Sequence, residues 1–579
     1  MNASLPPIEA AVLVAAVDGL PARLRKKLDD AVGRFAGLTV TVDGNRYTVA
    51  IDDATTVTLV ATGGVVRSAA DVTCTCLLAP NCLHRAGVLS NAPVGDAPAA
   101  TTSETLPQGE EAEELGVAQR AAVEQVWRAA VDVLGGGVSG SGAVARAALL
   151  RAAHEAQATK VYRPAAAARV VATLLQAARG DDAHYRLADL GVALRELLLV
   201  THALRTGASR ELGTARRQYQ VEGSLRLYGL CSTAVLAGTG HAGVVTYAAD
   251  RDGRLWMVAD VMPGDAKRAA RGGDATLAMG ETALTHRGFA RAGLVLTGAT
   301  AAESRQLGAG RGVRAVTASG VAWHEEPLAG LWAEPVAAQV RRAFAALAVP
   351  VGDRAAGGEL LFLSVTVRGT DGDAVQAEHA DGTPLTLRVA VDHPDLGYRE
   401  NLRVLGRATG LRMLLIARPD PGRPGTVLPL AVAPVAGERW RIEGHADLAF
   451  DRLHASQLPA APAEGAPAPV PVPREAHDPA LRLLTAQVER AVAGGRVMLT
   501  LSRTSDASRL RRARFEAGAA LLERLVAAAN DRPRNAFGRL ADDDGTAFAQ
   551  AWLAAATYAD AATRALAEAA WLPAEASEF

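Results

Sequence analysis

Four residues in one short segment have the types and the spacing needed to bind a metal ion. Cys74 and Cys76 are followed by Cys82 and His84, in the pattern C-x-C-x5-C-x-H. Three thiolates and one imidazole form a complete tetrahedral shell for Zn²⁺, with sulfur ligands at about 2.3 Å. Because a filled shell leaves no position open for water, the pattern predicts a structural zinc site and not a catalytic one.

A strand end and a helix start would have to position these ligands. In an extended segment, residues i and i+2 point the same way, so the first two cysteines can chelate one ion from a strand end. Pro80-Asn81 then turns the chain, and the last cysteine and the histidine close the shell at the start of a helix over 83–89. Strand patterns at 39–42, 47–51 and 56–61 precede the ligands, with Asp43-Gly44 as a hairpin turn. The sequence therefore predicts a β-β-α knuckle.

This ligand pattern resembles the SWIM zinc finger, which reads C-x-C, a variable spacer, and C-x-H. The resemblance covers about 60–90 for the finger itself. The succession of finger, helical bundle and β-rich blocks is similar to the larger bacterial SWIM-containing proteins. Since genes of that group often accompany an AAA-type ATPase and a von Willebrand A domain protein, the resemblance implies both as partners in a multi-protein system. It implies no particular reaction.

Composition and charge narrow the class of protein further. The 579 residues are 49% hydrophobic and 21% charged, which is globular usage and excludes wholesale disorder and collagen. The formal net charge of −1 provides no global attraction to nucleic acid or anionic membranes. We find no secretory signal and no apolar run of the 18 or so residues that a spanning helix requires. We therefore expect a cytoplasmic protein with reduced cysteines, in which the isolated Cys231 fills a core.

Periodicity and composition predict an α+β multidomain protein. The segments are a SWIM-type zinc finger module at 1–95, a linker at 96–114, a helical bundle at 115–213, a β-rich domain at 218–330, a connecting helix at 331–350, a second β-rich, barrel-like domain at 358–450, an Ala/Pro linker at 456–476 and a C-terminal helical segment at 478–575. Both β-rich blocks have the length of an OB-like barrel. Neither carries a basic stripe interleaved with aromatic residues, so the sequence leaves their identity open.

Two glycine-rich segments imitate nucleotide-binding motifs. The segment 135–142 lacks the Lys-Ser/Thr ending of a phosphate loop, and a helix precedes it, so we interpret it as an interhelical turn. The segment 238–243 matches G-x-G-x-x-G, but a strand pattern follows it where a Rossmann site requires a helix. We interpret this second segment as a glycine hairpin.

Basic side chains provide the weakest candidate sites. The densest cluster is predicted at the start of a C-terminal helix, where positive charge opposes the helix macrodipole and could serve a phosphate or an acidic partner. Only two basic residues lie near the finger. A solvated face is the alternative interpretation for all of them. The candidates for nucleic-acid or partner binding are Arg67, Arg85, Arg509, Arg511, Arg512 and Arg514.

Three functions remain open from these residues. The first is a non-catalytic, zinc-binding adaptor or scaffold that mediates protein interactions. The second is a nucleic-acid-binding protein that uses the finger, although so few basic residues near it make protein contact at least as plausible. The third is an enzyme with a dispersed site, for which the sequence offers no catalytic residue.

Overall fold

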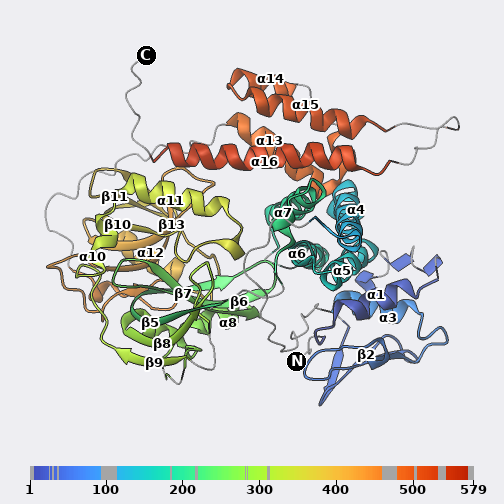
Figure 1. Ribbon diagram of the computed structural model, residues 1–579, viewed down its shortest axis with the longest axis horizontal. Coiled ribbons are helices and arrows are strands. Elements are labelled where there is room, and N and C mark those ends of the chain that lie inside the picture. Colours follow the sequence, from blue (N-terminus) through green and yellow to red (C-terminus); the bar gives the residue numbers. More distant parts are fainter. Residues whose placement is uncertain are drawn as a thin grey trace. The chain divides into compact units, whose positions relative to one another are not determined.

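The computed structural model describes residues 5–571 except for 22, 25–26, 29–31, 36–37, 93–113, 181, 183–184, 215–218, 281, 283, 309–312, 460–478, 501–504, 533–536 and 538–542 (Figure 1). The predicted linkers at 96–114 and 456–476 fall almost entirely outside these residues. The chain divides into two compact units. The first is Met1–Arg216 with Asp478–Ala559, and the second is Arg217–His477 with Asp560–Phe579. The fold class is α+β, as predicted.

The N-terminal module is a four-stranded antiparallel sheet with two helices. The strands are β1 (Val40–Asp43), β2 (Arg46–Ala50), β3 (Thr56–Val60) and β4 (Val72–Cys74), and the helices are α1 (Ala10–Asp18) and α3 (Leu83–Asn91). Gly44 has a φ of +58°, the left-handed conformation that the hairpin between β1 and β2 requires. Helix α3 contacts α1 and buries Ala86, Val88 and Leu89. The predicted β-β-α order is confirmed.

Four helices follow in the same unit and form the predicted bundle. They are α4 (Val117–Gly140), α5 (Ala143–Ala158), α6 (Tyr162–Arg179) and α7 (Leu187–Arg205). Each helix contacts the next, and α7 returns to α4. Val123, Val126 and Trp127 recur at helical spacing in the sequence, and all three are buried. The helical period of the sequence therefore identified the face that forms the core.

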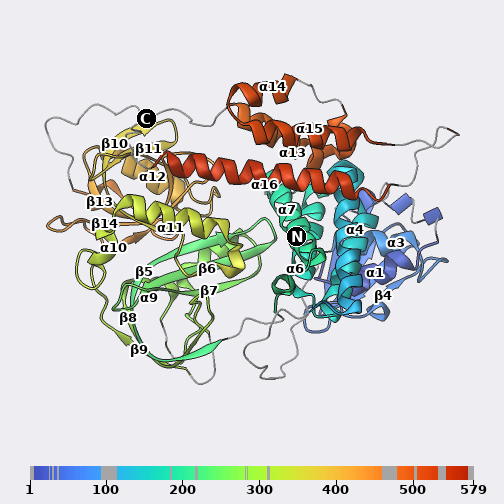
Figure 2. The same ribbon diagram turned by 45° about the horizontal axis from the view of Figure 1, so that its top comes forward.

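The C-terminal helices complete the first unit. They are α13 (Pro479–Gly494), α14 (Ser505–Arg512), α15 (Glu516–Asn530) and α16 (Thr546–Ala569), of which Ala559 is the last residue in this unit. Figure 2 shows α13 and α16 alongside each other, and Trp552 Nε1 of α16 donates to the carbonyl of Val488 in α13 at 3.0 Å. A Cβ on Gly137 would lie 2.2 Å from the backbone nitrogen of Gly495. Gly137, with a φ of +63°, therefore kinks the chain inside α4 just before the turn into α5, and its missing side chain lets the end of α13 approach closely.

The first β-rich domain belongs to the second unit and is an antiparallel sheet in the order β7-β6-β5-β8-β9. Its elements are β5 (Gln220–Leu236), β6 (His241–Ala249), β7 (Leu255–Pro263), α8 (Ala266–Arg271), α9 (His286–Arg291), β8 (Gly293–Ala301) and β9 (Arg314–Ala318). Met257 forms a parallel bridge with Gln306, and Leu307 forms an antiparallel bridge with Ala301. These bridges connect β7 back to β8, which makes the domain barrel-like. The segment 238–243 is the predicted hairpin between β5 and β6.

The second β-rich domain is a closed barrel. Its elements are β10 (Leu361–Asp371), β11 (Ala374–His379), β12 (Pro384–Leu387), α12 (Tyr398–Arg407), β13 (Arg412–Pro419), β14 (Thr426–Pro434) and β15 (Ala446–Asp447), preceded by α10 (Ala329–Ala333) and α11 (Val336–Ala348). The barrel closes where β12 pairs in parallel with β14, at Thr386 with Thr426 and Leu387 with Val427. Residues 439–442 form no strand, and β14 pairs instead with the shorter β15 that follows them.

The two β-rich domains share one connectivity. Each begins with a three-stranded meander, continues through helical segments, and returns with a strand that pairs with the first. In each, the third strand is bridged in parallel to the segment after the fourth. This is the connectivity of a five-stranded OB-type barrel, complete in the second domain and closed by single bridges in the first.

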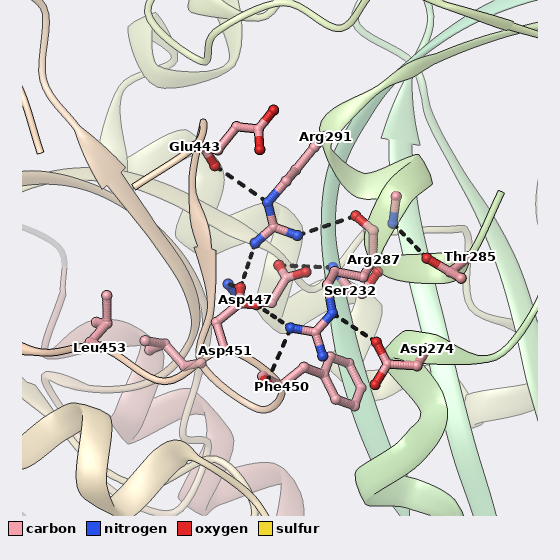
Figure 3. Close-up of polar contacts among 12 residues, drawn as sticks. Ser232, Asp274, Thr285, Arg287, Arg291, Glu443, Asp447, Phe450, Asp451 and Leu453 are labelled. Atoms are coloured by element: carbon pink, nitrogen blue, oxygen red, sulfur yellow. Dashed lines mark hydrogen bonds and ion pairs between the residues drawn. The ribbon is translucent and has the colours of Figure 1, made fainter. Parts of the chain in front are cut away.

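The two domains pack on one another through a shared apolar core and a polar joint. Leu230 and Tyr247 of the first domain belong to one buried cluster with Phe362 and Ile416 of the second. Figure 3 shows the joint, in which two arginines of α9 point to one carboxylate in the second domain. Arg287 Nη1 and Arg291 Nη2 each lie 2.5 Å from an oxygen of Asp451. Each β-rich domain therefore covers part of the outer surface of the other.

Candidate metal centre

Hydrogen bonds between β3 and β4 position the first two cysteines. Cys74 is the last residue of β4 and pairs with Val57. Thr75 then anchors the chain, because its amide donates to Thr56 at 3.1 Å and its hydroxyl donates to the carbonyl of Ala54 at 3.2 Å. With Thr75 held against the sheet edge in this way, Cys74 and Cys76 can reach one point in space.

The start of α3 positions the other two residues. Cys82 is the N-cap residue of this helix, and His84 lies in its first turn. One donor atom from each of Cys74, Cys76, Cys82 and His84 lies within 4.8 Å of all the others. A tetrahedral zinc site with bonds of about 2.3 Å has sulfur atoms about 3.8 Å apart, which is compatible with this spread. The structure therefore brings all four predicted ligands together around one site that can hold a metal ion.

The histidine has an unused nitrogen. His84 Nδ1 is buried and has no hydrogen-bond partner among the described residues. A buried polar atom without a partner is unfavourable by roughly 1–3 kcal/mol, so native proteins rarely leave one unsatisfied. A metal ion bound through Nδ1 would remove this penalty, and the donor set therefore fits a cation.

The thiols respond differently to their surroundings. Burial raises the pKa of Cys74 to about 12 and also raises the pKa of Cys82. The pKa of Cys76 is lowered, because hydrogen bonds from Cys82 and from backbone amides outweigh its burial. Metal ligation requires thiolates, so binding a cation here would release protons and stabilise the buried charges.

The ring of Phe35 packs against His84, and the sequence did not indicate this contact. The ring of Phe35 meets His84 edge to face, with centroids 6.2 Å apart. Gly87 makes room for this ring, because a Cβ there would lie 2.2 Å from Phe35 Cδ2. The residues of this contact are distant in sequence and belong to no motif, so only the fold could identify them.

The two arginines predicted near the finger occupy different positions. Arg67 is exposed and lies 4.0 Å from Glu9. Arg85 is only 5% exposed; it donates to the carbonyl of Pro80 at 3.2 Å and also to the carbonyl of Ala69. Burial lowers the pKa of Arg85, and the nearby Cys82 and Cys74 oppose that shift. Its guanidinium thus stabilises the ligand loop from inside the module.

The basic cluster of the C-terminal segment lies at the end of a helix and not at its start. Arg509, Arg511 and Arg512 occupy the last turn of α14, and Arg514 follows it with a φ of +66°. The sequence analysis placed these arginines at the start of a C-terminal helix, whereas α14 ends at Arg512 and α15 begins only at Glu516. Positive charge near a helix C-terminus is favourable, so the argument from an opposed macrodipole is wrong. Arg511 also forms an ion pair with Glu523 at 2.7 Å.

A buried arginine from the bundle holds the other end of α3. Arg146 of α5 is 4% exposed and donates to the carbonyls of Ser90 at 2.7 Å and Ala92 at 3.4 Å. Gln176 of α6 donates to Ala92 as well, at 3.0 Å. The helix that carries two of the four ligands is therefore fixed to the bundle at its C-terminus.

Neither a membrane-spanning helix nor a second metal-ligating cluster is found in the described part of the chain. Within the part of the chain that the structure describes, no helix has both the length and the apolar character needed to cross a membrane. Likewise, the cysteine and histidine cluster is the only group of metal-ligating side chains found among the described residues. No family model, curated protein or solved structure matches the chain.

Proposed function

We propose that this chain is a non-catalytic adaptor that recruits protein partners through a zinc-stabilised finger. The observation that carries the proposal is the convergence of three thiols and one imidazole within 4.8 Å. Zinc is the metal that this donor set favours, because soft thiolates with imidazole in a four-ligand site are typical of structural zinc. In so small a module, the metal would also supply folding free energy.

The surroundings of the finger favour a protein partner over nucleic acid. Arg85 is engaged with carbonyl oxygens, and the turn beside the ligands carries the exposed Asp52 and Asp53. Nucleic-acid binding relies on basic side chains that neutralise phosphates. Carboxylates in this place would instead repel a phosphate backbone.

The barrels also favour protein binding or scaffolding. OB-type barrels bind oligonucleotides on the face of their second and third strands and through two loops. In the second domain, the hairpin that joins β10 to β11 carries Asp371 at the end of β10 and Asp373 in the turn, and β11 is largely buried. Part of the remaining surface packs against the first domain. Both barrels are consistent with a scaffold for the finger.

The SWIM resemblance suggests which partners to test first. It implies an AAA-type ATPase and a von Willebrand A domain protein, and a finger that recruits one to the other would make this chain an adaptor in their complex. A cytoplasmic location follows from the same proposal, because AAA-type machines use cytoplasmic ATP.

A pull-down with matched cysteine variants tests the adaptor function. The full-length chain is used as bait for the two purified partner proteins, alongside Cys82→Ser and the control Cys231→Ala, which removes a buried thiol outside the cluster. We expect Cys82→Ser to lose both bound metal and partner, and Cys231→Ala to keep both. Partner retention by metal-free Cys82→Ser would contradict the proposal.

Nucleic-acid binding is the second candidate, because Arg509, Arg512 and Arg514 are exposed and close together in sequence. Filter binding of the purified chain to single- and double-stranded DNA and RNA across a salt series tests it. Affinity that falls steeply with salt would support this candidate, and no binding at low salt would remove it.

A further inference from the structure

The loop between the second and third ligands presents apolar side chains to solvent. Leu77 is fully exposed and Leu78 is 62% exposed, and the following Ala79 and Pro80 are exposed too. We call these four residues the apolar loop. Two adjacent leucines in water are unfavourable unless something covers them, since burying each is worth roughly 1.5–3 kcal/mol.

The apolar loop is held at both ends. Cys76 and Cys82 flank it and belong to one ligand cluster. Within it, the amide of Ala79 donates to the carbonyl of Cys76 at 3.1 Å, and Arg85 holds the carbonyl of Pro80. A loop already fixed in one conformation loses little entropy on binding, which favours its use as a docking element.

The charges beside the apolar loop indicate what kind of surface it fits. Thr75 bonds to Ala54, which places the exposed Asp52 and Asp53 in the turn next to the ligands. An anionic membrane would repel these carboxylates, and so would a nucleic acid. A protein pocket with an apolar floor and a basic rim complements both the leucines and the carboxylates.

We infer that the apolar loop inserts into an apolar pocket with a basic rim on the partner protein, and that Leu77 and Leu78 are its anchor residues. This inference rests on the proposed adaptor function and specifies its contact surface. The metal then has a second role, because it sets the conformation in which the leucines are presented.

Photocrosslinking from the loop tests the inference without a known partner. Leu77→p-benzoylphenylalanine is expressed in place of the native chain in its own cells, and Val42→p-benzoylphenylalanine, at a 42% exposed position of the same module, is the control. We expect a protein adduct at position 77 that mass spectrometry identifies and that the control lacks. An adduct to lipid or nucleic acid, or none above the control, overturns the inference.

The identified protein is then purified and its affinity measured. We expect Leu77→Asp/Leu78→Asp to weaken binding at least about tenfold with unchanged zinc content, and Val42→Asp to leave it unchanged. Asp53→Asn should lower the association rate a few-fold at low salt. A partner that Cys82→Ser loses but Leu77→Asp/Leu78→Asp keeps would overturn the loop contact and leave the adaptor function standing. A partner that both variants keep would overturn the two together.

Discussion

Arginine side chains join modules at two places in this chain, and the two joints differ in what the guanidinium meets. In the first unit, Arg146 binds the carbonyls that end α3, and no carboxylate among the described residues offsets the effect of burial on it. In the second unit, Arg287 and Arg291 share the carboxylate of Asp451 (Figure 3). Burial lowers the pKa of Arg146 to about 10, so it is still charged at neutral pH.

The joint at Arg146 therefore depends on another part of the module being folded, whereas the joint at Asp451 does not. Arg146 is stabilised only while α3 holds its last carbonyls in place, and the first turn of α3 carries Cys82 and His84. The metal centre and the buried arginine therefore depend on the same helix. The barrel joint has its own countercharge, so no distant site needs to be intact for it to form.

Removal of the metal should break the first joint and spare the second. Structural zinc contributes roughly 10–16 kcal/mol of apparent binding free energy in finger peptides, which makes this the largest expected effect. After treatment with a strong chelator, α3 should lose hydrogen-exchange protection and α5 around Arg146 should lose part of its own. Peptides from β10 and β13 serve as the internal control and should be unchanged. Full protection of α5 without metal would show that the joint is independent of the metal centre.

Local signals were enough to predict the ligand cluster and most of the elements. The C-x-C pair at a strand end and the C-x-H pair at a helix start are short-range features, and so are the period of α4 and the hairpin glycines. The fold class followed from the same patterns. The sequence also predicted α11, whose apolar spacing at Val336, Val340 and Phe344 is plain.

Long-range contacts could not be predicted in the same way. Nothing in the sequence pairs Arg146 with Ser90 or Phe35 with His84, because these contacts exist only after the elements pack. The helix α12 was missed between two strand patterns, although Tyr398, Leu402 and Leu405 lie on one face of it. The arginines of α14 were assigned to the wrong end of a helix, because exposed helix boundaries have weak signals.

Substitution of Arg146 should directly weaken the joint between α5 and the end of α3. Arg146→Met removes two charge-assisted hydrogen bonds and leaves the carbonyl of Ser90 without its donor, which we expect to lower the free energy of unfolding by about 2–3 kcal/mol. Arg151 lies on the same helix and, among the described residues, pairs only with Asp18, and the two side chains are 40% and 39% exposed. Arg151→Met is therefore the control. Its expected loss is below about 1 kcal/mol. Equal losses in the two variants would refute a special role for Arg146.

Neutralising the shared carboxylate should have a smaller effect. Asp451→Asn removes the countercharge of two arginines, but their side chains are 31% and 20% exposed, so water compensates in part. We expect a loss of about 1–2 kcal/mol in denaturant unfolding of the full chain, discounted from buried-pair values for this exposure. Asp274→Asn is the control, because this carboxylate also meets Arg287 but is 70% exposed. A control loss as large as that of Asp451→Asn would contradict the assigned countercharge.

His286, which lies next to Arg287 in α9, should give the smallest effect on stability, and this effect should depend on pH. His286 is fully buried, accepts or donates one bond at 2.8 Å to Thr246, and leaves Nε2 without a partner among the described residues. Burial lowers the pKa of His286, and Asp260 opposes the shift only in part.

The direction of this pH dependence follows from proton linkage. Because the folded state holds His286 neutral, the unfolded chain binds more protons once the pH falls below its unfolded pKa of about 6.5. Stability should therefore be constant above that pH and decline as the pH falls through 6 toward 5. The melting temperature of wild type and His286→Gln, measured from pH 7.5 to 5, checks this. The variant should lack that part of the decline, whereas identical slopes would assign the acid sensitivity to other groups. Since the described contacts of Arg146 with the end of α3 involve no histidine, the exchange protection of α3 should not follow this profile.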